Sequence, residues 1–108
     1  MELEEFSYSI EISERFRKSF KEILDYMLVV FYKSYTVYQK EVTERIEQIC
    51  EYPESFTILK KVKSGKLFRF AKFKQFKIFF FVENNSVFIV DNIHEKRSPK
   101  SLNFIDKV

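Results

Sequence analysis

Aromatic residues are abundant in this chain of 108 residues, whereas glycine is almost missing. The chain has 14 Phe and 6 Tyr against one Gly and two Pro. Because Gly and Pro supply the backbone conformations that tight turns need, so few of them allow few turns. The sequence therefore predicts long helices and strands joined by few loops. Residues 1–108 should form one domain, because a single hydrophobic core serves chains of roughly 100 to 150 residues.

The composition indicates a soluble protein of the cytoplasm. Hydrophobic residues make up 45% of the chain and charged residues 32%, which is too apolar for a disordered chain. Apolar runs such as Ile78 to Val82 are far shorter than the roughly 20 residues that cross a bilayer. The acidic start, Met1 to Glu5, lacks the order of a secretory signal. The single cysteine, Cys50, cannot form an intrachain disulfide.

The first half of the chain has the pattern of one strand and two helices. Residues 6–12 alternate between apolar and polar side chains, as in a strand with one buried face. Ser13 follows as a helix N-cap, and apolar spacings of three and four predict a helix to about Tyr32. After a connection at Lys33-Ser34-Tyr35, the same spacing predicts a second helix that ends before Pro53. A connection this short predicts an antiparallel helical hairpin.

The second half is richer in strand-forming residues. Pro53 to Lys63 shows no clean period, so a long loop is expected there. Three strands rich in Phe, Ile and Val follow over residues 66–74, 76–83 and 86–94. Glu83-Asn84-Asn85-Ser86 predicts a hairpin, because Asn tolerates the positive φ of two-residue turns. The order β-α-α-β-β-β predicts an α+β domain, with the helical hairpin packed on a mainly antiparallel four-stranded sheet.

Charge is divided unevenly along the chain. Residues 1–54 carry a net charge of −5 and residues 55–108 a net charge of +8. Eight basic residues and no acidic one occur between Lys60 and Lys77: Lys60, Lys61, Lys63, Lys66, Arg69, Lys72, Lys74 and Lys77. Such a run is typical of a surface that binds a polyanion. The alternative is a solvated strand face whose lysines prevent edge-to-edge pairing.

Other residue types give weaker indications. Phenylalanines alternate with these lysines, and a core role is favoured over base stacking, because a sheet under helices must bury one face. They are Phe68, Phe70, Phe73 and Phe76. Cys50, next to Ile49, is interpreted as a small buried hydrophobe and not as a nucleophile. One His and one Cys are too few for a metal site, and no phosphate-binding glycine loop is present, so no cofactor is expected.

Three short motifs, together with the element order, resemble the RelE/ParE superfamily of type II toxin-antitoxin toxins over about residues 7–99. Tyr8-Ser9-Ile10-Glu11-Ile12-Ser13 is similar to that family's first strand and helix start, and Tyr52-Pro53 to its helix close. His94-Glu95-Lys96-Arg97-Ser98-Pro99 looks like the His-x-x-Arg-x-Pro ending of ParE-like and plasmid-stabilisation members. Phe76-Lys77 departs from the family, where many ribonuclease members have Tyr-Arg, and Phe80 stands where a Tyr is often found.

The resemblance implies a cytoplasmic growth inhibitor that is silenced by a cognate antitoxin, with the complex often repressing its own operon. Operator DNA would then be bound only through that complex. ParE-like members poison DNA gyrase, which is a binding act, and the His-x-x-Arg-x-Pro ending favours this branch. For such a target, Lys66, Lys72, Lys74 and Lys77 are the candidate contact residues.

RelE-like members instead cleave mRNA on the ribosome without a metal ion. This reaction needs a base, an acid and a cation that stabilises the developing charge. Arg69 and Arg97 are the candidates for the cation, and His94 for proton transfer, because histidine titrates near neutral pH. The alternative for His94 is an imidazole hydrogen-bonded to backbone. A third alternative for the whole chain is a non-toxic basic binding module of the same fold.

Overall fold

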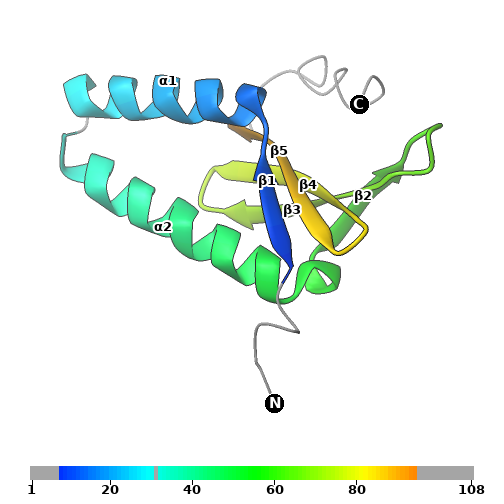
Figure 1. The fold of residues 1–108 in the computed structure, drawn as a ribbon. Coiled ribbons are helices and arrows are strands. Elements are labelled where there is room, and N and C mark those ends of the chain that lie inside the picture. Colours follow the sequence, from blue (N-terminus) through cyan, green and yellow to red (C-terminus); the bar gives the residue numbers. More distant parts are fainter. Residues whose placement is uncertain (1–7, 31, 95–108) are drawn as a thin grey trace.

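The computed structural model describes residues 8–30 and 32–94. They form two helices, a short 3-10 helix and five strands (Figure 1). In chain order these are β1 (Ser9–Ile12), α1 (Glu14–Val30), α2 (Tyr32–Glu51), η2 (Pro53–Ser55), β2 (Thr57–Lys61), β3 (Leu67–Phe73), β4 (Phe76–Glu83) and β5 (Ser86–His94).

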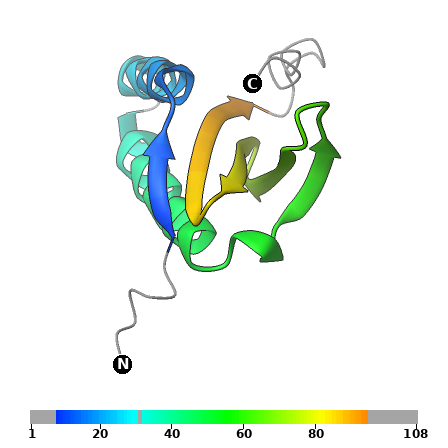
Figure 2. The same ribbon diagram turned by 45° about the vertical axis from the view of Figure 1, so that its right-hand side comes forward.

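The strands form one mixed sheet in the order β1-β5-β4-β3-β2. β1 pairs in parallel with β5, and the three other pairings are antiparallel. The α+β class, the helical hairpin and the mainly antiparallel sheet are as expected, but the sheet has five strands and not four. The turned view in Figure 2 shows both helices on one face of a curved sheet.

The fifth strand, β2, lies where the sequence predicted a long loop between Pro53 and Lys63, and that prediction was wrong. β2 is an edge strand, and four of its five side chains are exposed. A bulge between Ile58 and Lys60 also shifts the register against β3. Because neither face of β2 is fully buried and the bulge breaks the alternation, the sequence carries no period of two there.

The helix junction also differs from the prediction. α1 ends at Val30 and α2 begins at Tyr32, so the predicted connection at Lys33-Ser34-Tyr35 lies inside α2. The apolar spacing continues through this region, so it does not mark the turn. Neither helix in the described residues is long and apolar enough to cross a membrane.

The sequence signals for the start of α1 and for the turn between β4 and β5 are confirmed. The Phe16 amide donates to Ser13 Oγ at 2.9 Å, so Ser13 is the N-cap of α1, and its hydroxyl donates to the Val90 carbonyl at 2.6 Å. Asn84 and Asn85 have φ of 53° and 70° and connect β4 to β5. A two-residue hairpin turn requires these positive values.

The sheet separates two clusters of buried side chains. The helix-side cluster lies between the sheet and the helices and contains mainly aliphatic and aromatic residues: Phe16, Tyr38, Val42, Ile49, Ala71, Phe73, Ile78, Phe80, Val87 and Ile89. The second cluster lies on the opposite face, which we call the helix-free face. It consists of Val62, Phe68, Phe79, Phe81, Val90 and Ile93. Phe68 and Phe73 are thus core, as expected, whereas Phe70 and Phe76 are half-buried.

Candidate functional site

The alternation of β3 and β4 sends two groups of basic residues to different faces. Ala71 and Phe73 belong to the helix-side cluster, whereas Phe68 belongs to the second cluster. Even-numbered residues of β3 therefore face away from the helices. This places Lys72 on the helix-free face, and Lys77, directly opposite it on β4, shares that face.

Four lysines lie around the aromatic side chains of the helix-free face, and we call them the cationic face: Lys60, Lys66, Lys72 and Lys77. Lys60 on β2 stands opposite Phe68. Lys66 Nζ lies 5.2 Å from the centre of the Phe81 ring, and Lys77 Nζ lies 4.6 Å from that of Phe70. The structure therefore brings Lys66, Lys72 and Lys77 together, and it adds Lys60 to the predicted set.

Lys74 does not belong to this face. It lies in the turn between β3 and β4 with a φ of 53°, and its Nζ is 3.1 Å from Glu41 Oε1 on α2. A carboxylate from the acidic half of the chain thus pairs with this lysine. The turn redirects the side chain towards the helices, and the alternation along β3 could not predict that.

Arg69 is engaged with backbone and not with an open site. It lies on β3 opposite Ile58 of β2, and its Nη1 donates to the carbonyl oxygens of Phe56 at 2.8 Å and Glu54 at 3.3 Å. These contacts hold the entry to β2 against β3. The guanidinium therefore has an evident structural role at the edge of the sheet.

His94 ends β5 at a distance from Arg69. Its Nε2 lies 3.1 Å from Gln75 Oε1, and its ring meets the Phe76 ring edge-on at 5.2 Å. Arg69 pairs with Phe80 and His94 pairs with Phe76, on opposite sides of β4. Four residues along a strand correspond to about 13 Å. The structure thus does not bring Arg69 and His94 together, and Arg97 lies outside the described residues.

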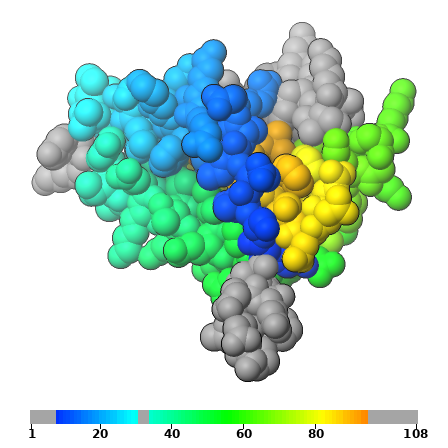
Figure 3. All heavy atoms as spheres, viewed as in Figure 1, coloured from blue at the N-terminus to red at the C-terminus, as the bar shows by residue number. Residues whose placement is uncertain are grey.

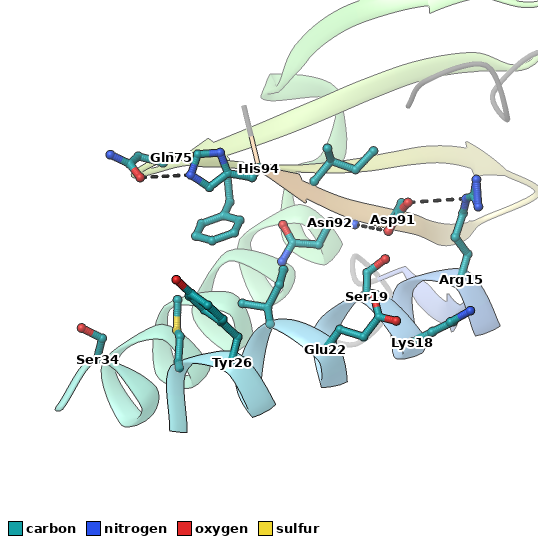
Figure 4. Close-up of a pocket in the computed structure, with 14 residues that line it drawn as sticks. Arg15, Lys18, Ser19, Glu22, Tyr26, Ser34, Gln75, Asp91, Asn92 and His94 are labelled. Atoms are coloured by element: carbon teal, nitrogen blue, oxygen red, sulfur yellow. Dashed lines mark hydrogen bonds and ion pairs between the residues drawn. The ribbon is translucent and has the colours of Figure 1, made fainter. Parts of the chain in front are cut away.

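A groove runs between α1 and the end of β5 (Figure 4). It encloses about 930 Å³, within the size range of ligand sites. The apolar part of its lining comprises Ile23, Tyr26, Met27, Phe76 and Ile93. The polar part comprises Arg15, Lys18, Ser19, Glu22, Ser34, Gln75, Asp91, Asn92 and His94.

Two buried polar residues of β5 line this groove. The Asn92 side-chain amide donates to the phenol oxygen of Tyr38 on α2, and its Oδ1 accepts no hydrogen bond from the described residues. Asp91 accepts from the Asn92 backbone amide at 2.7 Å and lies 3.5 Å from Arg15 Nε. Figure 4 shows Arg15 reaching from α1 towards Asp91.

The sequence analysis named His94, which also lines the groove, but it missed Asp91 and Asn92. Their signal was the pair Asp91-Asn92, two polar residues inside an otherwise apolar strand. Because burial of a polar group costs free energy unless it is hydrogen-bonded, such a pair indicates a built polar contact. Burial is also the main factor that raises the pKa of the Tyr38 phenol.

Cys50 is half-buried, not fully buried as expected. Burial and the nearby Glu47 carboxylate raise the pKa of its thiol. In the described part of the chain, no group of three or more His, Cys, Asp and Glu side chains could hold a metal ion.

Comparison with known proteins identifies the family. Among curated proteins, none matches the sequence. The family model described as the ParE toxin of the type II toxin-antitoxin system parDE matches residues 10–99. Because this match covers most of the chain, the protein belongs to the ParE toxin family, within the RelE/ParE superfamily of type II toxin-antitoxin toxins.

Proposed function

We propose that the protein arrests bacterial growth by binding DNA gyrase in the cytoplasm, and that a cognate antitoxin silences it. Membership in the ParE toxin family supports the toxin role and the antitoxin partner. Gyrase is the target that ParE-like members poison, and poisoning by binding requires a contact surface, not a set of catalytic groups.

The observation that carries this choice is the separation of Arg69 from His94. Cleavage of RNA by its own 2′-OH needs a proton acceptor and a charge-stabilising cation within hydrogen-bond reach of one phosphate. The register places the two side chains on strands at opposite sides of β4, about 13 Å apart along it. Arg69 is also bonded to two backbone carbonyls. This arrangement favours binding over catalysis.

Two assays with the purified full chain test the target. In a gyrase supercoiling assay we expect inhibition that rises with toxin concentration. In a translation reaction, mapping of mRNA ends should reveal no new cuts. Site-specific mRNA cuts with gyrase unaffected would contradict the proposal and favour the RelE-like mechanism. Normal growth of induced cells would contradict the toxin role and favour a non-toxic binding module.

The groove between α1 and β5 is the surface we propose for the antitoxin. Its apolar floor and mixed polar rim suit an amphipathic segment with acidic residues, because Lys18 is exposed at the rim.

Two charge reversals on α1 provide a matched test of the groove. Lys18 lines the groove, whereas Lys21 lies on the same helix, is 77% exposed and pairs with Asp25. Lys18→Glu should weaken antitoxin binding at least tenfold in a titration, and Lys21→Glu should stay within twofold of the wild type. Equal effects of the two changes would argue against the groove.

A further inference from the structure

The end of α1 is both apolar and exposed, and the function proposed so far does not explain it. Val29 is 84% exposed, Val30 50% and Leu28 46%. No charged side chain occurs between Tyr26 and Val30. A helix turn that is apolar all round is normally buried, and apolar side chains that lie together on a surface mark a site where a partner binds. The end of α1 is therefore a candidate interface.

Val29 and Val30 continue the side of α1 that lines the groove. The groove residues of this helix recur every three or four positions, and Tyr26 is among them. Residues three and four positions apart are neighbours on a helix, so Val29 and Val30 both follow Tyr26 on that side. Leu28 lies on another side, two turns after Lys21. The groove thus opens directly onto two of the three exposed apolar side chains.

We propose that the antitoxin segment in the groove extends over Val29 and Val30 and covers them with apolar side chains of its own. The ParE toxin family implies an antitoxin partner. This inference rests on the groove proposed above for that partner. It adds the chemistry that the segment carries at each of its ends.

The two valines alone offer too little surface for a stable dimer of toxins. A specific interface buries about 800 Å² on each partner and uses about 20 to 30 residues a side. On the side of Leu28, the apolar surface ends at the Lys21–Asp25 ion pair. On the other side it continues into the groove. A partner that already fills the groove can bury both valines without a second cost of association, and this favours the antitoxin over a second copy of the chain.

The groove changes in character along its length, and this fixes the direction of the antitoxin segment. Figure 4 shows Arg15 and Lys18 towards one end of the groove and Tyr26 towards the other. Acidic side chains suit the Lys18 end, and apolar ones suit the valine end. A segment in the reverse direction would lose hydration of its acidic side chains against an uncharged surface.

The spacing along α1 sets the length of segment required. Lys18 and Val29 are 11 residues apart on the helix, which corresponds to about 17 Å. An antitoxin segment covers this distance with about 11 residues as a helix or about five as an extended chain. In Figure 3 the last turns of α1, coloured cyan, lie at the left-hand edge of the molecule. A partner can reach them from solvent.

The test measures the affinity of the full toxin chain for its antitoxin by isothermal titration calorimetry. The antitoxin is the protein whose co-expression restores growth of cells that carry the toxin. Val30→Gln and Leu28→Gln form a matched pair, because the two residues lie in the same helix turn and are 50% and 46% exposed. The double variant Val29→Gln with Val30→Gln removes the whole proposed contact. Circular dichroism confirms that each variant is folded.

We expect the double variant to bind the antitoxin about tenfold more weakly or less tightly still, since burial of one valine corresponds to roughly that factor. Val30→Gln should weaken binding about threefold or more, whereas Leu28→Gln should stay within about twofold of the wild type. Equal effects of Val30→Gln and Leu28→Gln would overturn the proposal. So would a toxin dimer that the double variant abolishes while antitoxin affinity is unchanged, because the valines would then bind a second copy.

Photo-crosslinking tests the direction of the segment. A photoreactive side chain at position 18 should capture an acidic peptide of the antitoxin, and one at position 29 should capture a different, apolar peptide. Capture of the two peptides in the reverse order would overturn the proposed direction.

The outcomes also separate this inference from the proposed groove. Weaker binding by Lys18→Glu with unchanged binding by the valine double variant would overturn the valine contact and leave the groove standing. Unchanged binding by both variants would overturn the groove and the valine contact together.

Discussion

The side-chain amide of Asn92 on β5 donates a hydrogen bond to the phenol oxygen of Tyr38 on α2, inside the helix-side core. Asn92 is 2% exposed and Tyr38 5%. The Tyr38 ring also packs against Phe76 at 5.0 Å and Phe73 at 5.9 Å, between ring centres. One tyrosine thus connects the second helix to three neighbouring strands of the sheet.

Tyr38→Phe should lower the free energy of unfolding by about 1–3 kcal/mol, because it leaves the buried Asn92 amide without its acceptor. Urea denaturation followed by circular dichroism measures the change. Tyr52→Phe is the matched control, since Tyr52 is 68% exposed, and it should change stability by less than about 0.5 kcal/mol. Adding Asn92→Leu to Tyr38→Phe should recover part of the loss, because both polar partners are then removed.

The same tyrosine predicts a dependence on alkaline pH. Burial raises the pKa of Tyr38 above its ordinary value of about 10, so the folded state holds the phenol proton more tightly than the unfolded state. The contribution of the protonated Tyr38 phenol to the free energy of unfolding is constant below about pH 10 and is lost as pH rises above that value. The stability difference between wild type and Tyr38→Phe should therefore shrink by about 1.4 kcal/mol per pH unit there, measured by urea denaturation. A constant difference would contradict this.

Local signals in the sequence predicted the parts of the fold that depend on local chemistry. Ser13 caps α1 and Asn84-Asn85 turns the last hairpin, because each interaction lies within a few residues. β2 and the parallel pairing of β1 with β5 were not predicted. They depend on partners more than 10 residues away or on an exposed edge, and neither leaves a period in the sequence.

The candidate functional site could be predicted only in part, again because some of its contacts join segments that are distant in the sequence. The run of basic residues put Lys66, Lys72, Lys74 and Lys77 forward as one set of candidate contact residues, and the structure brings the first, second and fourth of these to one face. The run could not show that the turn takes the Lys74 side chain to Glu41. Nor could it show that Arg69 is occupied by two backbone carbonyls, because these come from a segment that was expected to be a loop.

In the turn at Asn84-Asn85, replacing Asn85 with Ala or with Gly should have opposite effects on the free energy of unfolding. Asn85 has a φ of 70°, in the left-handed region that costs a residue with a Cβ about 1–2 kcal/mol. Asn85→Ala should lower the unfolding free energy by about 1 kcal/mol, because Asn tolerates this conformation better than Ala. Asn85→Gly should equal or exceed the wild type. Equal stability of the Ala and Gly variants in urea denaturation would show that the turn does not impose this φ.

Variants of Arg69 can distinguish a structural role of this residue from a catalytic one. Arg69→Ala should lower the unfolding free energy by about 1–3 kcal/mol, because the Phe56 and Glu54 carbonyls lose a charged donor. Arg69→Lys should recover part of that loss, since one ammonium can still reach a carbonyl. Arg17→Ala is the control, because that side chain is 61% exposed and its contact with Glu14 spans 3.9 Å.

Growth arrest measured beside stability decides between the two roles of Arg69. If the guanidinium only holds the entry to β2, toxicity of each variant should follow its folded fraction, and Arg69→Lys should remain toxic. If it stabilises charge in RNA cleavage, Arg69→Ala should keep its unfolding free energy and lose toxicity together with mRNA cuts. We expect the first outcome, because a guanidinium that acted in catalysis would first have to break both carbonyl hydrogen bonds.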